Sequence, residues 1–542
     1  MLLSYTKINP YLGAIIIFFT LSLVVNYFAV PNMLSHDKLS NELYLLKSGN
    51  PELFANDYAL EGASWRFFYV PFVEMLRLAN RFTGSSEETY RILVPILFFV
   101  FTSGMFVFFY RLGNSFWASI FTAVVSSVYI PEVLHENWGI PGPSMILHRH
   151  MALALLPIAY FLFYQYINNA KLLIVFFLVG LIGNIHPVSS FYVTLIFLIT
   201  LLFAHGFRKE TIKKAFLSGL AALLGITPFL IWHFILYPAN GDLFIINDET
   251  YLNAVWEAQP HVSPAGMTNL YFRTFITNWY AFWPLTGIFF LTAWLWSKKN
   301  DESKKGFLRT SMILFWATAL VTITISAGQQ ILQIFFKIAP LTIEEPRAFR
   351  FIYFVLYLHL AYLLSFTHEL FRSYRYALSM RQKLAAAAIV IFITIFAGFL
   401  LQQKISRAAF LLSLKKNEPD SGNTCRLPMY GWISGHTPQD SIFLINPNIF
   451  PAFRICALRG LVNHYRDVPP AILSRDKIVE WARRKHIIET AYAGNNPQKI
   501  KLAADQFNAA YIITENCLIL PELQKIYEDN GNNCIYAVKN NY

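Results

Sequence analysis

The chain has 542 residues, of which 55% are hydrophobic, 17% aromatic and only 14% charged. Soluble domains carry about 25% charged residues, and a soluble protein of this size could not bury so much apolar surface in one or two cores. The composition therefore predicts a multi-span membrane protein. The net charge of +12 suggests an anionic partner, nucleic acid or membrane, until the positions of Lys and Arg are examined.

About eleven segments are apolar and long enough to span the membrane, since crossing it takes roughly 20 residues for about 30 Å of hydrocarbon. They lie near residues 11–30, 92–110, 115–130, 151–167, 172–186, 188–205, 215–237, 279–297, 310–327, 350–370 and 384–402. The long apolar run 172–205 is interrupted by Pro187, which removes a backbone donor, so we expect two short helices to meet there.

The orientation follows from the basic residues in the loops. With the N-terminus inside, the inner segments hold 16 basic and 4 acidic residues, whereas the outer loops up to residue 402 hold 11 basic and 16 acidic residues. The positive charge is thus explained by topology, and no nucleic-acid partner is expected. The distribution predicts an integral membrane protein, of the inner membrane if the source is bacterial, with a cytoplasmic N-terminus.

The tail 403–542 has the composition of a small α/β domain, which the topology places on the extracytoplasmic side. Strands are predicted at 441–445, 510–514 and 534–538, and helices at 476–484 and 497–507. All four cysteines lie here, at Cys425, Cys456, Cys517 and Cys534. An even set confined to one domain predicts up to two disulfides in an oxidising compartment, with three possible pairings.

The first outer loop, residues 31–91, carries two candidate catalytic carboxylates. Asp37 follows the first span closely, and Asp57 stands in Asn56–Tyr58. Either could act as a general base for an acceptor hydroxyl or help to hold a divalent cation, Mg²⁺ or Mn²⁺; a solvated loop residue or a helix N-cap is the alternative. The stretch 65–81 is amphipathic and is predicted to lie along the membrane surface.

The second outer loop, residues 131–150, concentrates acid–base groups. On a helix, Glu132, His135 and Glu136 would share one face and could form half of a metal site, although an interfacial polar network is the favoured interpretation. His148 and Arg149 follow at the mouth of the next span and are candidate substrate-binding residues.

Three further candidates lie at the outer ends of later spans. His186 precedes the proline of the broken helix pair, where irregular backbone either lines a wet cavity or forms a hydrogen-bonded kink. Arg347 and Arg350 are three residues apart, which suits a phosphate or pyrophosphate oxygen; the alternative is pairing with Glu344 and Glu345. No Walker A or other nucleotide-binding motif is present in the sequence.

This architecture resembles the GT-C glycosyltransferases, which include protein O-mannosyltransferases, aminoarabinose transferases and the oligosaccharyltransferase catalytic subunit. The likeness rests on about eleven spans, a long first outer loop with an acidic residue just after span one, and a C-terminal outer domain. The tail, with Thr437–Ser441 before a strand and Phe453–Arg459 after it, also looks like the outer domain of uncharacterised bacterial membrane proteins related to this superfamily. The Trp-Trp-Asp motif of oligosaccharyltransferases is missing, so peptide N-glycosylation is not expected.

The resemblance implies an all-α GT-C-like membrane domain at 1–402 and an inverting transfer of sugar from a polyprenyl-phosphate carrier to an acceptor hydroxyl. It gives Asp37, with Asp57 second, the role of base or metal-side carboxylate, and Arg347 or Arg350 that of phosphate ligand. The expected partners are the lipid-linked sugar and the bilayer. The alternative is a non-catalytic protein, either a transporter or flippase of lipid-linked sugar or an assembly factor.

Overall fold

A computed structural model of the chain describes most of the membrane domain and the tail. The described residues are 9–28, 36–61, 71–113, 115–128, 132–133, 136–139, 148–236, 247–277, 279–297, 302–338, 345–373, 425, 427–467, 474–515, 517–519, 523–529 and 533–538. The predicted span at 384–402 lies outside them.

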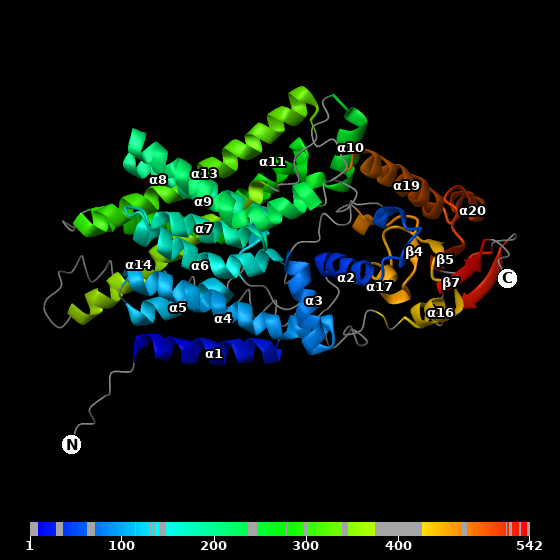
Figure 1. Cartoon of the computed structure of the whole chain (residues 1–542), viewed down its shortest axis with the longest axis horizontal. Coiled ribbons are helices and arrows are strands. Elements are labelled where there is room, and N and C mark those ends of the chain that lie inside the picture. Colours follow the sequence, from blue (N-terminus) through cyan, green and yellow to red (C-terminus); the bar gives the residue numbers. More distant parts are fainter. Residues whose placement is uncertain are drawn as a thin grey trace, which may run out of the picture.

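Helices occupy every predicted apolar segment up to residue 373 (Figure 1). They are α1 (Pro10–Phe28), α4 (Ser86–Gly113), α5 (Phe116–Val128), α6 (His148–Tyr166), α7 (Leu172–Gly183), α8 (Pro187–His205), α9 (Lys209–Ile231), α12 (Trp279–Ser297), α13 (Glu302–Phe336) and α14 (Ile352–Ser373). Among the described residues, five helical segments are long and apolar enough to cross a membrane, and shorter apolar helices accompany them. The mostly helical membrane domain is confirmed, while the number of eleven spans stays a prediction.

The predicted break between α7 and α8 is present. Pro187 takes the first position of α8, where its missing N–H costs nothing, and His186 caps this helix by accepting a hydrogen bond from the backbone N–H of Ser189. Asn184 completes the connection, because its side chain donates to the carbonyl of Gly225 and accepts from the N–H of Phe229 at 2.8 and 2.9 Å. The break is therefore held by hydrogen bonds to α9.

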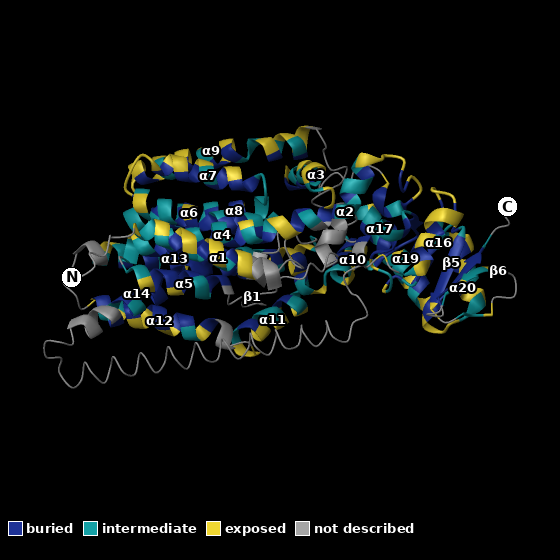
Figure 2. Ribbon diagram, turned by 90° about the horizontal axis from the view of Figure 1, so that it is seen from below, coloured by how far each residue is buried: buried dark blue, intermediate teal, exposed yellow. Residues whose placement is uncertain are grey.

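Helices α7 and α9 approach each other more closely than side chains larger than glycine would allow. A Cβ atom on Gly180 would overlap the carbonyl oxygen of Ala222, and one on Gly225 would overlap that of Phe177. Small residues allow such backbone contact between helices in membranes. The pair lies at one side of the bundle (Figure 2). Of the 18 most apolar consecutive residues in the helical segment Lys209–Ile235, which contains α9, only 28% are buried.

Gly180→Ala should destabilise the protein by about 1–3 kcal/mol through overpacking, although alanine is the better helix former. Gly219→Ala is the matched control, since the added Cβ on the same helix pair meets no atom within 4 Å. Thermal unfolding of the purified protein in detergent measures both variants. Equal stability of the two would contradict the close approach of α7 and α9.

The core of the membrane domain is built around α14. Of the 18 most apolar consecutive residues in the segment Ala348–Thr367, 89% are buried. Figure 2 colours residues by burial. Trp138, from the loop between α5 and α6, inserts beside this helix: its ring stacks on Tyr353 and Tyr357, and its Nε1 donates to the carbonyl of Ser126 at 2.9 Å. This buried side chain fixes the loop that precedes α6.

The first loop forms a layer between the membrane helices and the tail domain (Figure 1). It contains α2 (His36–Gly49), the short η1 (Tyr58–Leu60) and α3 (Pro71–Thr83). Part of the predicted amphipathic stretch is therefore helical, in α3, whose Phe72, Val73 and Leu76 are buried while Leu78 and Phe82 are exposed. A second set of short helices connects α9 to α12, namely η4 (Trp232–Leu236), α10 (Glu249–Ala258), η5 (Pro260–Val262), α11 (Pro264–Phe272) and η6 (Arg273–Thr277).

The tail is an α/β domain with a five-stranded sheet in the order β4-β3-β5-β7-β6. Its elements are α16 (Pro428–His436), β3 (Ile442–Leu444), α17 (Phe453–Ala457), β4 (Gly460–Leu461), η8 (Tyr465–Asp467), α19 (Arg475–Ala493), α20 (Pro497–Gln506), β5 (Tyr511–Glu515), β6 (Gln524–Glu528) and β7 (Asn533–Ala537). Strands β4, β3 and β5 are parallel, whereas β7 is antiparallel to both β5 and β6.

The sheet is covered on both faces, because alternate residues of its strands point to opposite sides. Leu444 packs with residues of α19 and α20, whereas its neighbours Phe443 and Ile445 pack with residues of α16 and α17. The predicted strands and helices are all present, and β4 and β6 are additional. Two disulfides form, as expected, and join Cys425 to Cys456 and Cys517 to Cys534.

The less favoured alternative for the second outer loop, a shared helical face, is not formed. Glu132 and Glu136 do not lie on one helix: they belong to two short antiparallel strands, β1 (Glu132–Val133) and β2 (Glu136–Asn137). The strands pack against η7 (Glu345–Phe351), so pairing and tertiary contact override the helical spacing of the sequence. The shared helical face that would have made half of a metal site is therefore not formed.

Candidate functional site

Basic side chains from three separate segments meet where α6 and α8 begin. The ring centroids of His148, in the first turn of α6, and His186, the N-cap of α8, are 4.9 Å apart. Arg350 reaches the same place from η7, where its Nη2 donates to Ser189 Oγ at 2.9 Å. Arg149 and His150 follow His148 in the first turn of α6. We call His148, Arg149, His150, His186 and Arg350 the basic cluster.

Ser189 joins the two sides of the basic cluster. Its Oγ lies 2.8 Å from His186 Nδ1, and its backbone N–H donates to the same nitrogen at 3.0 Å. Arg350 is only 3% exposed, so its contact with Ser189 is made away from bulk water. Ser189 thus positions both the guanidinium group and the imidazole ring.

The cluster is cationic, because it contains the guanidinium groups of Arg149 and Arg350. His186 accepts the backbone N–H of Ser189 on Nδ1, which an imidazolium ring cannot do, so its ring is neutral. Because Nδ1 accepts from Ser189, the proton of the neutral ring belongs on Nε2. Two guanidinium groups and an N–H donor are therefore gathered in a partly buried place, which suits an anion with several oxygens.

The first loop covers the basic cluster. Phe72, in the first turn of α3, is 1% exposed, and its ring centroid lies 5.8 Å from that of His148. Helix α3 in turn packs against α2, where Arg77 donates a hydrogen bond to Ser48. The helix that carries Asp37 is thus connected to the basic cluster through α3.

Several predicted site residues are placed only in part. Asp37 lies in the first turn of α2, Glu136 in β2 and Arg347 in η7, but their side chains are outside the described part of the structure. His135 is likewise outside it. His148, Arg149, His186 and Arg350 are the predicted residues that the structure brings together.

Asp57 lies elsewhere, in a buried contact between the first loop and the tail. Its carboxylate accepts hydrogen bonds from Arg454 Nε at 2.6 Å and Nη2 at 3.0 Å, from the N–H of Leu461 at 2.8 Å and from that of Ala59 at 3.0 Å. Arg454 also forms a two-bond ion pair with Asp467. We call Asp57, Arg454 and Asp467 the buried triad.

The buried triad gives Asp57 a structural environment. Asp57 is fully buried, and the other two members are at most 6% exposed. Burial alone would lower the pKa of Arg454, but Asp467 and Asp57 raise it above its usual value, so this residue stays charged. With its oxygens occupied by four donors, Asp57 is a weaker candidate for the base than Asp37.

Sequence reasoning missed Ser189, Arg454 and Asp467 as partners in these contacts. Asp57 and Arg454 are 397 residues apart, and no local spacing connects them. The basic character of residues 148–150 was the signal that did identify part of the cluster.

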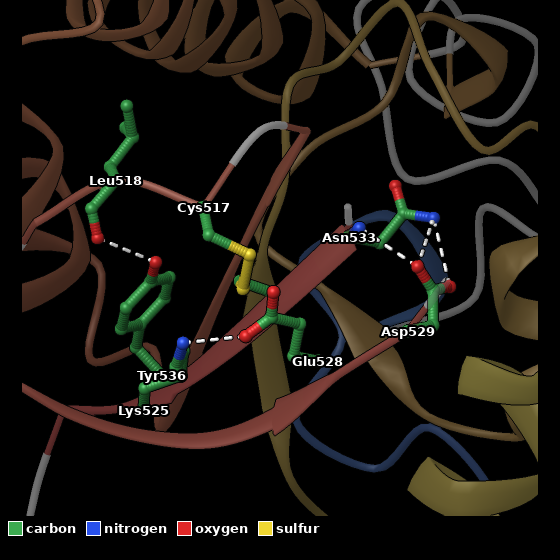
Figure 3. The surroundings of a disulfide bond; sticks show 8 residues. Cys517, Leu518, Lys525, Glu528, Asp529, Asn533 and Tyr536 are labelled. Carbon is green, nitrogen blue, oxygen red and sulfur yellow. Dashed lines mark hydrogen bonds and ion pairs between the residues drawn. A yellow bond between two sulfur atoms is a disulfide. The ribbon is translucent and has the colours of Figure 1, made fainter. Parts of the chain in front are cut away.

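A possible metal-ligand group in the tail is accounted for by a disulfide. Within the described residues, Cys517, Glu528 and Cys534 form the one group of potential ligand atoms that lie within 4.8 Å of one another. The two sulfur atoms are bonded to each other, and Glu528 pairs with Lys525 at 2.6 Å (Figure 3). A disulfide leaves no thiolate to bind a cation, so this group is not assigned a metal.

His464, beside the buried triad, makes the tail domain sensitive to acid. Burial and the charge of Arg454 lower its pKa from 6.5 to about 3, although a hydrogen bond to the carbonyl of Ile449 opposes this. As the pH falls below 6.5, the unfolded chain takes up this proton before the folded one does. The folded state should therefore lose up to about 1.4 kcal/mol per pH unit.

Calorimetric unfolding of the purified protein between about pH 7 and pH 4 measures this loss. The variant His464→Gln keeps a polar side chain but does not titrate, so its stability should fall less steeply with acid. Burial also raises the pKa of Asp467, and this contribution is common to both proteins. Identical pH dependence would show that His464 is not held neutral.

Comparison with known proteins gives a match to one family model and to solved structures. The model of a domain of unknown function, DUF6798, matches residues 426–488, which run from α16 into α19. No curated protein matches the sequence. Among solved structures, the apo form of the Archaeoglobus fulgidus oligosaccharyltransferase is similar with a TM-score of 0.45 and 12% identity, over 94% of this chain and 70% of that chain. A likeness of this degree carries no argument about activity.

Proposed function

We propose that this protein is a membrane glycosyltransferase of the GT-C type, which moves a sugar from a polyprenyl-phosphate carrier to an acceptor hydroxyl. The observation that carries the proposal is the meeting of His148, His186 and Arg350 from three segments of an apolar helical domain, with Arg149 next to His148 in the first turn of α6. A lipid-linked phosphate combines an apolar tail with an anionic head, and this combination matches apolar helices that end at a basic cluster.

In the proposed reaction the phosphate of the carrier binds the basic cluster, with Arg350 and Arg149 as its cations. Asp37 takes the proton of the acceptor hydroxyl, whose oxygen attacks the anomeric carbon. The bond between that carbon and the phosphate oxygen breaks, and the lipid phosphate leaves with the electron pair. Attack from the opposite side inverts the anomeric configuration. The guanidinium groups stabilise the charge that develops on the leaving phosphate.

The same proposal includes the topology. The N-terminus would be cytoplasmic and the tail extracytoplasmic, in the inner membrane of a bacterium. The charge distribution of the loops supports this orientation, and the two disulfides support an oxidising compartment for the tail.

Incubation of the purified protein with a panel of polyprenyl-phosphate sugars and candidate acceptors tests the reaction. Release of the free carrier phosphate together with a glycosylated acceptor is the expected result. Parallel reactions with EDTA and with added Mg²⁺ or Mn²⁺ show whether a divalent cation is needed. Carrier binding without release across the whole panel would contradict the enzyme and favour a non-catalytic protein that handles lipid-linked sugar.

Arg350→Gln should weaken binding of polyprenyl phosphate by about 10- to 100-fold, because a hydrogen bond to a charged group is worth about 1.5–3 kcal/mol. Arg111→Gln is the control, since Arg111 contacts the ring of Tyr11 and is not part of the basic cluster. Titration of carrier phosphate into each protein measures the dissociation constants. Equal affinity of the two variants would remove Arg350 from the site.

A further inference from the structure

The first loop and the tail domain are joined by the buried triad at the edge of the tail sheet. Strand β4 is an edge strand, so the N–H of Leu461 that points outward has no partner within the sheet. Asp57 accepts this N–H and also both hydrogen bonds from Arg454. Gly460 lies directly beside Asp57, since an added Cβ would be in ordinary contact with Asp57 Cβ at 3.4 Å, whereas it would overlap Ile442 Cδ1.

A buried ion pair of this kind specifies a geometry more than it adds stability. Removing the charges from water costs free energy that offsets most of their attraction. All of their hydrogen-bond donors and acceptors can be satisfied in only one arrangement, however, so the ion pair selects that arrangement. Asp467 is held in that arrangement by the N–H of His464, which donates to its Oδ2 at 2.7 Å. The triad therefore fixes one position of the first loop on the tail domain.

Helix α2 lies directly against the triad. Tyr44 is 1% exposed and belongs to the apolar cluster that Leu458 of the tail packs against, and α2 contacts α17, the helix that carries Arg454. Lys47, one turn further, is also buried and donates to the carbonyls of Pro51 and Leu53 at 2.7 and 2.6 Å. Its positive charge acts on Asp57 and balances the net negative charge of the triad.

An apolar cluster extends this contact to α3. Tyr44, Leu53, Phe54, Leu60 and Val73 are all buried together, and Leu458 of the tail packs against them. Val73 adjoins Phe72, whose ring contacts His148 in the basic cluster. Helix α3 therefore contacts the cluster that reaches Leu458 of the tail through Val73 and contacts the basic cluster through Phe72.

Asp37 lies on the same helix, seven residues before Tyr44. Seven residues are about two turns, or about 10 Å along the axis. Tyr44 and Lys47 hold the C-terminal part of α2 in place, which fixes the direction of the helix. The position of its first turn, which carries Asp37, therefore depends on this contact.

We propose that the buried triad is a positioning latch, in which Arg454 of the tail domain fixes α2 and thereby places Asp37 for the transfer reaction. Arg454 is then a positioning residue, and the tail domain has a direct part in organising the site. The inference rests on the proposed glycosyltransferase activity for its kinetic consequence, but the ordering of α2 is independent of that activity. The residues of the latch on the tail side, Arg454 and Asp467, lie within the part that matches DUF6798.

Hydrogen–deuterium exchange on the full chain in detergent tests the latch directly. In Arg454→Met, the amides of α2 after its first turn should exchange at least about tenfold faster than in the wild type. Arg454→Lys keeps the charge without the two-pronged geometry and should fall between them. Arg475→Met is the matched control, because Arg475 joins the tail to Asp248 before α10 at a more exposed contact. If Arg454→Met does not fold, Asp467→Asn, which keeps the shape of the side chain, takes its place.

Kinetics on the same variants test the positioning role. Arg454→Met should lower kcat by about 100-fold, the cost of a small misplacement of a reacting group, while the affinity for carrier phosphate stays unchanged. If Arg454→Met folds and the amides of α2 exchange at the rate of the wild type, the latch is contradicted. It is also contradicted if these amides exchange faster but kcat does not change. If the wild type transfers no sugar, the proposed function fails, whereas the exchange measurement still decides whether the triad holds α2.

Discussion

Asp37→Asn is expected to remove sugar transfer, with a loss of about 10²- to 10⁴-fold, while the protein stays folded. Asparagine has the shape of aspartate but cannot accept the proton of the acceptor hydroxyl, and a general base contributes a factor of this size. Because the carrier phosphate would bind at the basic cluster, its affinity should not change. The rate of carrier release, measured with the sugar and acceptor identified by the panel, is the readout.

Asp505→Asn provides the control for this variant, since Asp505 is an exposed carboxylate on α20 in the tail. It should transfer sugar at the rate of the wild type. Full activity of Asp37→Asn would exclude Asp37 as the base. If Asp37→Asn instead fails to bind the carrier, Asp37 contributes to binding of the lipid-linked sugar.

Arg454→Met should lower the free energy of unfolding by about 3–5 kcal/mol. Removal of one member of a buried ion pair leaves uncompensated charge in a place that water does not reach. Here two carboxylates, Asp57 and Asp467, would lose their common cation, and each is almost completely buried. Urea unfolding of the wild type and the variant, followed by circular dichroism, gives the difference.

The control for stability is Arg475→Met, which makes the same chemical change where the side chain is 41% exposed. Water can hydrate the remaining carboxylate there, so little change is expected. A similar loss in both variants would show that the burial of the triad is not what makes Arg454 important. A loss below about 1 kcal/mol for Arg454→Met would contradict the buried ion pair.

Local sequence predicted most of the secondary structure. Apolar runs gave the ten membrane-domain helices from α1 to α14 that match predicted spans, and Pro187 located the break between α7 and α8, whereas α2, α10 and α11 were not predicted. The strands β3, β5 and β7 were visible because buried strands read as short apolar runs. The strands at Glu132 and Glu136 show the limit of such spacing, which says which residues would share a face on a helix but not whether a helix forms.

The sequence by itself therefore determined that this is an apolar, mostly helical membrane protein with a small cysteine-containing α/β tail. Hydrophobicity and spacing are properties of neighbouring residues, so they can be read along the chain. Only the tertiary structure decided which cysteines pair, that Arg350 shares Ser189 with His186, and that Asp57 meets Arg454 across 397 residues. Contacts between distant segments depend on how whole helices and sheets pack, and single residues carry no sign of their distant partners.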